Sequence, residues 1–431
     1  MRLFAVAGSP VLHSKSPLLF NKLFKANSVD ALYTRIGPES IEELFFLAEY
    51  LGFEGLNITS PFKGSIYPFM DEWDAQAQKT GSVNTVIFKE GKRKGFNTDP
   101  DGVSLALMNR SLEVTSKKCL VLGAGGAGKA AALALQNRGA DVVILNRTVE
   151  KAADFASRIG CRAFGLNDLP IHRKDAFVII NTIPEINTVV KDIVPGKESV
   201  IFDAVYHNSE LESICRQAGV SFIPGEEWLL NQARRSFEIF TGNKPEVDEW
   251  DPSLLWTRDS GGAGRNVSLI GFMGCGKTSA AAALARELGY SLLDTDSEIE
   301  KQEGRSISQI FSLKGEAYFR RKEREVISRL GGTKRLVVAC GGGAVLDQEN
   351  RKLLRKNSIV VWLFNTAEES VRRLSGKERP LLEKNDPVEK AGRLFQERKE
   401  KYFVSSDLII SSQKNMKEVV RRAYEEVVRM F

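Results

Sequence analysis

The sequence predicts an α/β protein in which N-terminal α/β domains are joined by a linker to a C-terminal one. Short apolar runs alternate with helical patterns along most of the 431 residues, as is typical of parallel sheets covered by helices. Two glycine-rich segments, residues 123–128 and 271–278, each lie between a strand pattern and an alanine-rich helical pattern. Backbone amides at such strand–helix turns bind phosphate groups. We expect domains at 1–101 (closed by a helix at 226–241), 102–242 and 266–431, with a linker at 243–265.

The composition limits the kinds of partner. The chain is 42% hydrophobic and has a net charge of +6 spread along its length, with no basic stretch interleaved with aromatic residues, so we expect no nucleic-acid partner. No apolar run approaches the roughly 20 residues that span a bilayer, and the first residues have a strand pattern rather than that of a signal peptide. The 5 scattered cysteines and 3 histidines indicate neither disulfides nor a histidine metal site. We expect a cytoplasmic protein without a membrane partner, and the sequence contains no signal for an oligomeric state.

The first hundred residues contain strand patterns at 3–7, 31–36 and 53–58, helical patterns between them, at 17–25 and 40–51, and then a hairpin pattern at 83–88 and 93–97. Open α/β sheets bind ligands at the carboxyl ends of their strands. The polar residues found there suit a small polyol that carries a carboxylate, and a lysine beside a carboxylate can move a proton when a hydroxyl and a ketone interconvert. These residues are Ser14, Ser16, Asn57, Thr59, Lys63, Asn84, Asn97 and Asp99.

Residues 118–145 follow the dinucleotide-binding, or Rossmann, pattern of strand, glycine-rich loop, helix and second strand. Gly123 allows the tight turn, Gly125 the close approach of a pyrophosphate, and Gly128 the packing of helix on strand. The further loop residues expected to contact the cofactor are Ala124, Gly126 and Ala127. Strand patterns at 176–182 and 200–204 continue the sheet.

The residues that end the second strand favour NADP over NAD. An NAD site has an Asp or Glu there for the ribose 2′-hydroxyl, whereas this chain has Asn146, Arg147 and Thr148. A carboxylate would repel a 2′-phosphate, but Arg147 can pair with one and stack on the adenine. The alternative is that Arg147 is simply a solvent-facing residue at a helix start.

Seven ordered motifs within about residues 1–242 resemble shikimate dehydrogenase. They are Ser14-Lys-Ser16-Pro, Asn57-Ile-Thr59-Ser-Pro-Phe-Lys63, Val83-Asn84-Thr-Val, Asn97-Thr-Asp99, the glycine loop, Asn146-Arg147-Thr148 and Trp228-Leu-Leu-Asn-Gln232. The resemblance implies NADPH-dependent reduction of 3-dehydroshikimate to shikimate, with Lys63 and Asp99 as the catalytic pair. It also implies a substrate pocket lined by Ser14, Ser16, Asn57, Thr59, Asn84, Tyr206 and Gln232.

The linker at 243–265 contains two prolines, several acidic residues and Ser-Gly-Gly-Ala-Gly, without sustained periodicity. After it, strand patterns recur at 267–270, 291–293, 336–339, 359–364 and 408–410, with helical patterns between them. This alternation predicts a P-loop domain with a five-stranded parallel sheet. Its loop, Gly-Phe-Met-Gly-Cys-Gly-Lys-Thr, is expected to bind ATP, with Lys277 on the outer phosphates and the Thr278 hydroxyl on Mg²⁺.

The groups expected to hold the phosphate acceptor are acids, glycines and arginines. Asp294 and Asp296 follow the second strand, so that one can assist Mg²⁺ and the other can orient an attacking hydroxyl; the alternative for Asp296 is a helix cap. Glycines 341–343 let the backbone approach a ligand, or form a plain turn. Arg320, Arg379 and Arg398 suit a carboxylate and a migrating phosphate charge. The stretch 375–385 has the composition of a lid.

These features together resemble shikimate kinase over about residues 266–431. The motifs are the P-loop, Asp294-Thr-Asp296, Tyr318-Phe-Arg320-Arg-Lys-Glu323, Cys340-Gly341-Gly342-Gly343, Arg379-Pro-Leu and Arg398 before Tyr402. The resemblance implies ATP-dependent phosphorylation of the shikimate 3-hydroxyl, with Lys277, Asp296 and Arg379 catalytic, Thr278 and Asp294 at Mg²⁺, and Arg372 or Arg373 on adenine. It implies a nucleotide site of Gly274, Cys275, Gly276, Lys277, Thr278, Ser279 and Arg379, and a shikimate site of Asp296, Arg320, Gly342, Gly343 and Arg398.

The sequence therefore predicts a bifunctional enzyme whose first half makes shikimate and whose second half phosphorylates it. Two alternatives stay open from the sequence. One is a ligand-sensing regulator that kept both pockets and lost the chemistry. The other is a first half that prefers quinate or NAD.

Overall fold

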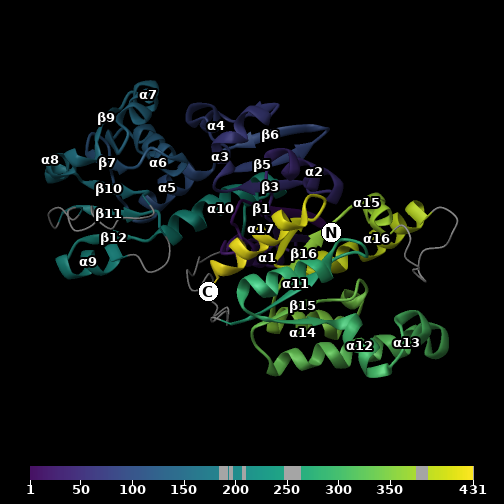
Figure 1. Cartoon of the computed structure of the whole chain (residues 1–431). Coiled ribbons are helices and arrows are strands. Elements are labelled where there is room, and N and C mark those ends of the chain that lie inside the picture. The colour runs from purple at the N-terminus through teal and green to yellow at the C-terminus, as the bar shows by residue number, and fades with distance from the viewer. Residues whose placement is uncertain (184–192, 194–197, 206–209, 247–263, 375–386, 431) are drawn as a thin grey trace. The chain divides into compact units, whose positions relative to one another are not determined.

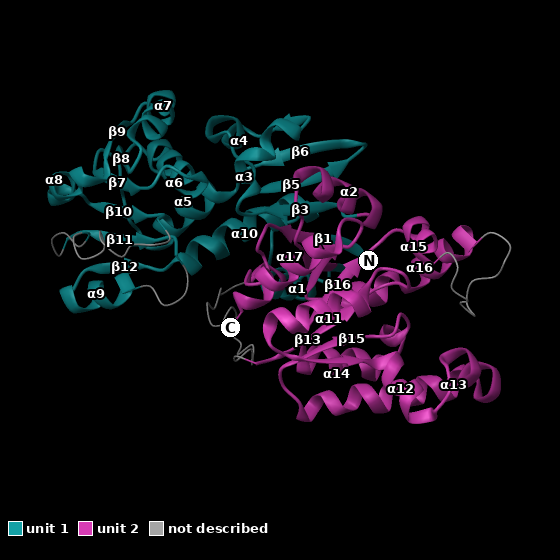
Figure 2. Ribbon diagram, viewed as in Figure 1, with its two compact units in different colours: residues 1–4, 18–31, 53–257 teal, residues 5–17, 32–52, 258–431 magenta. Residues whose placement is uncertain are grey.

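A computed structural model describes residues 1–183, 193, 198–205, 210–246, 264–374 and 387–430 (Figure 1). The chain divides into two compact units (Figure 2). Unit 1 comprises Met1–Phe4, Leu18–Ala31 and Phe53–Thr257, and unit 2 comprises Ala5–Pro17, Leu32–Gly52 and Arg258–Phe431. Unit 2 thus includes two segments from the first hundred residues as well as the C-terminal part of the chain. β1 (Arg2–Ala7) and α1 (Ser16–Ala26) contribute residues to both units.

Unit 1 contains a six-stranded parallel sheet, in the order β12-β11-β10-β7-β8-β9. β7 lies in its middle, with β10 on one side and β8 on the other, so the strand order reverses there, as the dinucleotide-binding prediction requires. Its helices include α6 (Gly126–Asn137), α7 (Val149–Ile159) and α9 (Glu210–Ala218). The strands are β7 (Lys118–Leu122), β8 (Asp141–Asn146), β9 (Arg162–Gly165), β10 (Val178–Asn181), β11 (Val200–Asp203) and β12 (Ser221–Ile223).

Both faces of this sheet are buried, which explains why its central strands are continuous apolar runs. In β7, Cys119 and Val121 belong to the core under α6, whereas Leu120 and Leu122 belong to the core on the opposite face. The alanines of α6 let the helix lie close to the strands, and Ala130–Ala132 have no exposed surface. This close packing positions the glycine loop between β7 and α6.

Besides the first residues of β1, the rest of the described part of unit 1 contains four strands in the order β3-β5-β6-β4. The predicted hairpin is confirmed, because β5 (Thr85–Lys89) and β6 (Lys92–Phe96) pair antiparallel. β3 (Gly55–Ile58) pairs antiparallel with β5, and β4 (Glu72–Trp73) lies beside β6. The helices are α3 (Phe62–Ser65), α4 (Ala75–Thr80), α5 (Asp99–Asn109) and α10 (Gly225–Thr241), the last of which confirms the expected helix at 226–241.

Unit 2 contains the predicted five-stranded parallel sheet, in the order β14-β15-β13-β16-β17. The strands are β13 (Asn266–Ile270), β14 (Ser291–Asp294), β15 (Leu336–Ala339), β16 (Ser358–Phe364) and β17 (Leu408–Ser411). β2 (Ala31–Ile36) adjoins β17 through the single residue pair Ile36 and Ile409. Every residue of β13 and of β16 is buried, so the loop that follows β13 starts from a rigid position.

Helices pack against the strands of unit 2 and complete its core. Those of the C-terminal part are α11 (Lys277–Leu288), α12 (Thr295–Glu303), α13 (Ile307–Ser328), α14 (Gln348–Asn357), α15 (Ala367–Leu374), α16 (Pro387–Ser405) and α17 (Met416–Val428). α2 (Ile41–Leu51) comes from the first hundred residues. None of the helices that the structure describes combines the length and the apolar character that crossing a bilayer requires.

Candidate active sites

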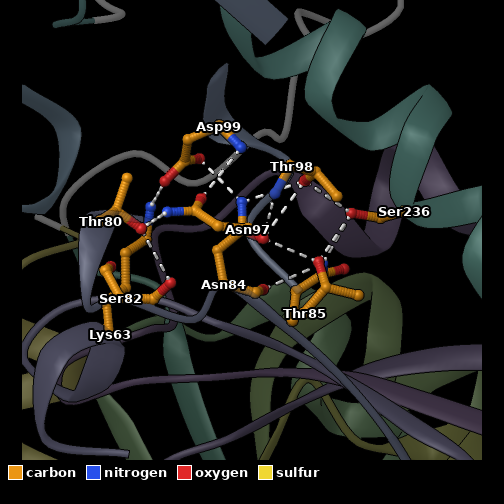
Figure 3. Close-up of polar contacts among 10 residues, drawn as sticks. Lys63, Thr80, Ser82, Asn84, Thr85, Asn97, Thr98, Asp99 and Ser236 are labelled. Atoms are coloured by element: carbon orange, nitrogen blue, oxygen red, sulfur yellow. Dashed lines mark hydrogen bonds and ion pairs between the residues drawn. The ribbon is translucent and has the colours of Figure 1, made fainter. Parts of the chain in front are cut away.

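Lys63 and Asp99 form a close ion pair in unit 1 (Figure 3). The Lys63 Nζ donates to the Asp99 Oδ2 at 2.6 Å. Asp99 is almost fully buried at the start of α5, whereas the Lys63 side chain, on α3, is 24% exposed. The pair predicted from the sequence is therefore formed, with its carboxylate shielded and its ammonium group open to a ligand.

The other oxygen of Asp99 is held by Asn84, which precedes β5. The Asn84 Nδ2 donates to the Asp99 Oδ1 at 2.9 Å, and its Oδ1 accepts from the Thr98 amide at 2.9 Å. The Asn97 side chain accepts from the Asp99 amide at 3.2 Å. Asn84 thus orients the segment 97–99 and holds the carboxylate that faces Lys63.

Ser236, on α10, joins this arrangement to the next polar residues (Figure 3). Its buried Oγ accepts from the Asn57 Nδ2 at 3.1 Å and shares hydrogen bonds with the hydroxyls of Thr85 at 3.0 Å and Thr98 at 3.1 Å. One helical turn earlier, Gln232 has a buried Oε1 that finds no hydrogen-bond partner among the described residues. Because a buried carbonyl oxygen without a partner is costly, it marks Gln232 as a group that a ligand can satisfy.

The glycine loop of unit 1 has the geometry expected of a dinucleotide site. A Cβ at Gly128 would collide with the Gly123 carbonyl oxygen, so this position excludes every other residue. A Cβ at Gly125 would meet nothing within 4 Å, which leaves the backbone open to a phosphate. A Cβ at Gly126 would lie 3.7 Å from the Lys63 Cδ. The structure therefore brings the predicted cofactor loop and the predicted catalytic lysine to the same place.

The end of β8 is tied to this loop. The Asn146 Oδ1 accepts from the Ala124 amide at 3.1 Å, and its Nδ2 donates to the Thr148 carbonyl at 2.8 Å. Arg147, between them, is exposed. An exposed guanidinium beside a cofactor loop, with no carboxylate in the residues that end the strand, fits a 2′-phosphorylated ribose.

The structure describes only some of the remaining residues predicted for the first site. Ser14 and Ser16 belong to unit 2, where both are buried and the Ser14 Oγ donates to the Ser16 Oγ at 3.2 Å. Thr59 follows β3 in unit 1 and is partly buried. Tyr206 lies outside the described residues.

In unit 2, the P-loop connects β13 to α11 as predicted. The Lys277 Nζ donates to the carbonyls of Gly271 and Phe272, both at 2.9 Å, so it lies over the loop. The Thr278 hydroxyl donates to the Asp294 Oδ2 at 2.8 Å. A hydroxyl and a carboxylate this close are oxygen ligands of the kind that Mg²⁺ prefers, and they fit a metal that completes its coordination with water and phosphate oxygens.

Asp294 also caps α12, because its Oδ1 accepts from the amides of Asp296 and Ser297 at 3.1 Å each. The helix cap weighed for Asp296 from the sequence thus belongs to Asp294. Asp296 instead lines a pocket together with Arg320, Glu323, Arg398 and glycines 341–343. The structure therefore gathers the predicted acceptor residues in one pocket.

The three glycines matter because side chains approach them closely. A Cβ at Gly343 would collide with the Arg320 guanidinium, and one at Gly341 would lie 2.6 Å from carboxylate oxygens of both Asp296 and Glu323. The Gly342 carbonyl accepts from the Tyr402 hydroxyl at 2.7 Å and from Arg398 at 3.4 Å. The alternative of a plain turn is therefore not favoured, since charged groups converge on this backbone.

Glu323 is a charged residue of this pocket to which the sequence assigned no role. It is completely buried, and its Oε2 accepts from the Arg320 Nη1 at 2.8 Å. Burial, reinforced by the Asp296 and Asp347 carboxylates, raises the pKa of Glu323 to about 7 against the opposing effect of Arg320. Glu323 lies one turn after Arg320 on α13, and this spacing on a helix is the signal that could have found it.

The nucleotide end of the site is described in part. Gly274, Cys275, Gly276 and Ser279 belong to the loop and the first turn of α11, where Ser279 is exposed. Arg372 and Arg373, the candidates for stacking on adenine, both pair with Glu369. Arg379 and the expected lid at 375–385 lie outside the described residues.

Family models match three parts of the chain. The "Shikimate dehydrogenase substrate binding domain" model matches residues 6–86, and the "Shikimate / quinate 5-dehydrogenase" model matches residues 104–194. A shikimate dehydrogenase (NADP⁺) of Methanocella arvoryzae is 37% identical over 268 residues, which are 59% of this chain and 98% of the relative. The chain belongs to the shikimate dehydrogenase family. In addition, the shikimate kinase model matches residues 273–428, so a shikimate kinase domain follows in the same chain.

Solved structures agree with the first assignment. Shikimate 5-dehydrogenase of Thermus thermophilus, in complex with NADP(H) and shikimate, is 31% identical with a TM-score of 0.52 and covers 59% of this chain and 97% of its own. Quinate dehydrogenase of Corynebacterium glutamicum, in complex with NAD, is 26% identical with a TM-score of 0.52. The match covers 59% of this chain and 96% of that structure's chain. Both enzyme activities of the chain, in the shikimate pathway, follow from its two sets of family domains.

Proposed function

We propose that the chain reduces 3-dehydroshikimate to shikimate with NADPH and then phosphorylates shikimate to shikimate 3-phosphate with ATP. The observation that carries the first step is the Lys63–Asp99 pair, which lies against Gly126 of the glycine loop. The second step is supported by the P-loop and the pocket that contains Asp296, Arg320 and Arg398. The family domains at residues 6–86, 104–194 and 273–428 agree with both.

For the reduction, NADPH supplies a hydride to the carbonyl carbon when it is bound. The Lys63 ammonium group, held by Asp99 at 2.6 Å, donates a hydrogen bond and then a proton to the carbonyl oxygen as negative charge develops there. Asn84 keeps Asp99 in place. The side chains that bind the substrate are Ser14, Ser16, Asn57, Thr59, Asn84, Tyr206 and Gln232.

The cofactor of the first step is NADP(H). The backbone from Gly123 to Gly128 accommodates the pyrophosphate at the N-terminus of α6. Arg147 pairs with the 2′-phosphate, and Asn146 and Thr148 hold the end of β8 against the loop.

For the phosphorylation, the loop amides and Lys277 bind the phosphates of ATP, and Thr278 and Asp294 hold Mg²⁺. Asp296 orients the attacking 3-hydroxyl of shikimate. Arg320 and Arg398 bind the shikimate carboxylate beside the backbone of Gly342 and Gly343. Arg379 neutralises charge on the transferring phosphoryl group.

We propose the domain boundaries expected from the sequence, at 1–101, 102–242 and 266–431 with a linker at 243–265. The three family matches fall within these three ranges. A reducing compartment, the cytoplasm, suits five cysteines that are all free.

The test is a pair of assays on the intact chain. Oxidation of NADPH is measured with 3-dehydroshikimate, and formation of ADP is measured with shikimate. We expect both. Absence of either activity in the folded chain rejects that half of the proposal, and binding of shikimate without any turnover would favour a ligand-sensing regulator.

The family match to a shikimate or quinate dehydrogenase, together with the similarity to a quinate dehydrogenase in complex with NAD, favours one second candidate, oxidation of quinate with NAD by the first half. Comparison of kcat/KM for shikimate and quinate, each with NADP⁺ and NAD⁺, separates the two. Arg147 and the absence of an acidic residue at 146–148 are the reasons to expect NADP⁺ and shikimate to give the higher value.

A further inference from the structure

Glu426, on α17, is a buried carboxylate whose partners are backbone amides from the start of the chain. It is 3% exposed. Its Oε2 accepts from the amides of Val11 at 2.8 Å and Leu12 at 2.7 Å, and its Oε1 accepts from Val11 at 3.0 Å. All these residues belong to unit 2. A carboxylate that receives charge-assisted hydrogen bonds in a buried place fixes the backbone that donates them.

The backbone held in this way leads directly to Ser14 and Ser16. We call residues 11–16 the Ser14 loop. Its turn is closed by the Ser14 amide, which donates to the Val11 carbonyl at 2.9 Å. The Ser14 carbonyl accepts from the guanidinium of Arg35 at 2.7 and 3.1 Å. The Ser14 loop is therefore held at one end by Glu426 and near the other by Arg35, and its two hydroxyls are bonded to each other.

The two sides of this contact come from different family domains. The Ser14 loop falls within the match to the dehydrogenase substrate-binding model, and Glu426 falls within the match to the shikimate kinase model. We propose that Glu426 is a positioning residue for the dehydrogenase reaction, by which a helix of the kinase domain fixes the loop that presents Ser14 and Ser16 to 3-dehydroshikimate. This inference rests on the substrate-binding role given to those two serines under the proposed function.

The proposal makes a specific kinetic prediction. Under the proposed function, Lys63 and Asp99 act on the reacting carbonyl and the two serines only bind the substrate, so Ser14 and Ser16 should stabilise the bound substrate and the transition state alike. Loosening their loop then raises KM for 3-dehydroshikimate and leaves kcat nearly unchanged. A residue that only maintained the fold would not produce this split.

Arg422 provides the comparison that separates positioning from general packing. It lies one turn before Glu426 on α17 and is equally buried. Its guanidinium donates to the Glu43 Oε2 at 2.7 Å, to the Gly37 carbonyl and to the Ser411 carbonyl, none of which is in the Ser14 loop. Arg422→Met therefore weakens the surroundings of α17 without touching the Ser14 loop.

The experiment uses the full chain and measures both activities of each variant. We expect Glu426→Gln to raise KM for 3-dehydroshikimate about tenfold, with kcat and both kinase parameters within about twofold of wild type. Glu426→Asp keeps the charge on a shorter side chain and should restore part of the loss. Glu425→Gln, at an exposed neighbour paired with Arg421, is the matched control and should behave as wild type.

Several results would overturn the proposal. A wild-type KM in Glu426→Gln would do so, as would an equal rise of KM in Arg422→Met. If every Glu426 variant lost both activities together with the folded state, the residue would be a general structural one and the proposal would fail. The wild-type chain decides the proposed function separately, because a lack of NADPH oxidation there refutes the dehydrogenase assignment itself.

Discussion

The two glycine-rich loops differ in where their positively charged side chains come from. In the loop before α11, the lysine expected to bind the phosphates belongs to the loop's own sequence motif. At the loop before α6, the lysine and arginine expected to contact the ligands come from other segments of unit 1. Lys277 is the first residue of α11, and its ammonium group lies over the carbonyls of Gly271 and Phe272. At the other loop, Lys63 comes from α3 and Arg147 from the end of β8. A P-loop can therefore be recognised as one short motif, but a dehydrogenase site is assembled from separate segments.

The largest expected effect tests whether the two loops serve independent reactions. Lys63→Ala should lower kcat for the reduction by about 10²–10⁴-fold, because the proton donor is lost, and leave phosphorylation unchanged. Lys277→Ala should lower phosphorylation by about 10²-fold or more, since a charge that stabilises the transferring phosphoryl group is lost, and leave the reduction unchanged. Steady-state assays of both activities on each variant provide the measurement.

Lys79→Ala and Lys301→Ala are matched controls, because both lysines are exposed helix residues outside the two sites. Each should retain both activities. Loss of both activities in Lys63→Ala or Lys277→Ala, in a chain that is still folded, would contradict the separation of the two sites.

A second prediction concerns Arg147, the positively charged residue that follows β8 next to the dinucleotide loop. Arg147→Gln should lower kcat/KM for NADPH about 10–100-fold, because an ionic hydrogen bond to the 2′-phosphate is lost. The value for NADH should stay nearly constant. Arg158→Gln, an exposed arginine on α7 paired with Asp154, is the control. An unchanged ratio of the two cofactors would show that Arg147 does not contact the phosphate.

A third prediction addresses the assembly of the first site from distant segments. Ser236→Ala removes the hydroxyl that joins α10 to Asn57, Thr85 and Thr98. We expect KM for 3-dehydroshikimate to rise about fivefold and the free energy of unfolding to fall by about 1 kcal/mol. Kinetics together with urea unfolding measure both quantities. Arg235→Ala, its exposed neighbour, should change neither, and an unaltered KM in Ser236→Ala would limit this serine to packing.

The smallest expected effect concerns the kinase pocket and its pH dependence. The pKa of Glu323 is about 7 in the folded chain, above its ordinary value of 4.5, so protonation favours the folded state. This contribution is complete below about pH 4.5 and is lost as the pH rises through 7. The melting temperature of unit 2 should therefore fall between pH 5 and pH 8 in the wild type. In Glu323→Gln this fall should be about 5 °C smaller, as measured by calorimetry.

Glu316 supplies the control for this measurement, since it also pairs with Arg320 but is half exposed. Glu316→Gln should keep the wild-type pH dependence. If Glu323→Gln kept it too, burial of the Glu323 carboxyl would not be its source.

Much of the fold could be read from the sequence, because strand and helix patterns are local. β2 begins and ends where the sequence predicts, and the five strands of the P-loop sheet occur at the predicted apolar runs. β9 and β12 were not predicted, since they are short edge strands with few buried residues. The strand expected at 176–182 is shorter in the structure, where β10 is Val178–Asn181.

The sequence by itself determined both families of chemistry, since the glycine loops, Lys63, Asp99 and Lys277 lie in motifs whose spacing is local. Only the tertiary structure decided which residues hold these loops and side chains in place. Ser236 bonds to Asn57 across 179 positions, and Glu426 bonds to Val11 across 415. Periodicity reports which face of an element is buried, not which distant element covers that face. The residues that orient the side chains of the sites can therefore be identified only from the folded structure.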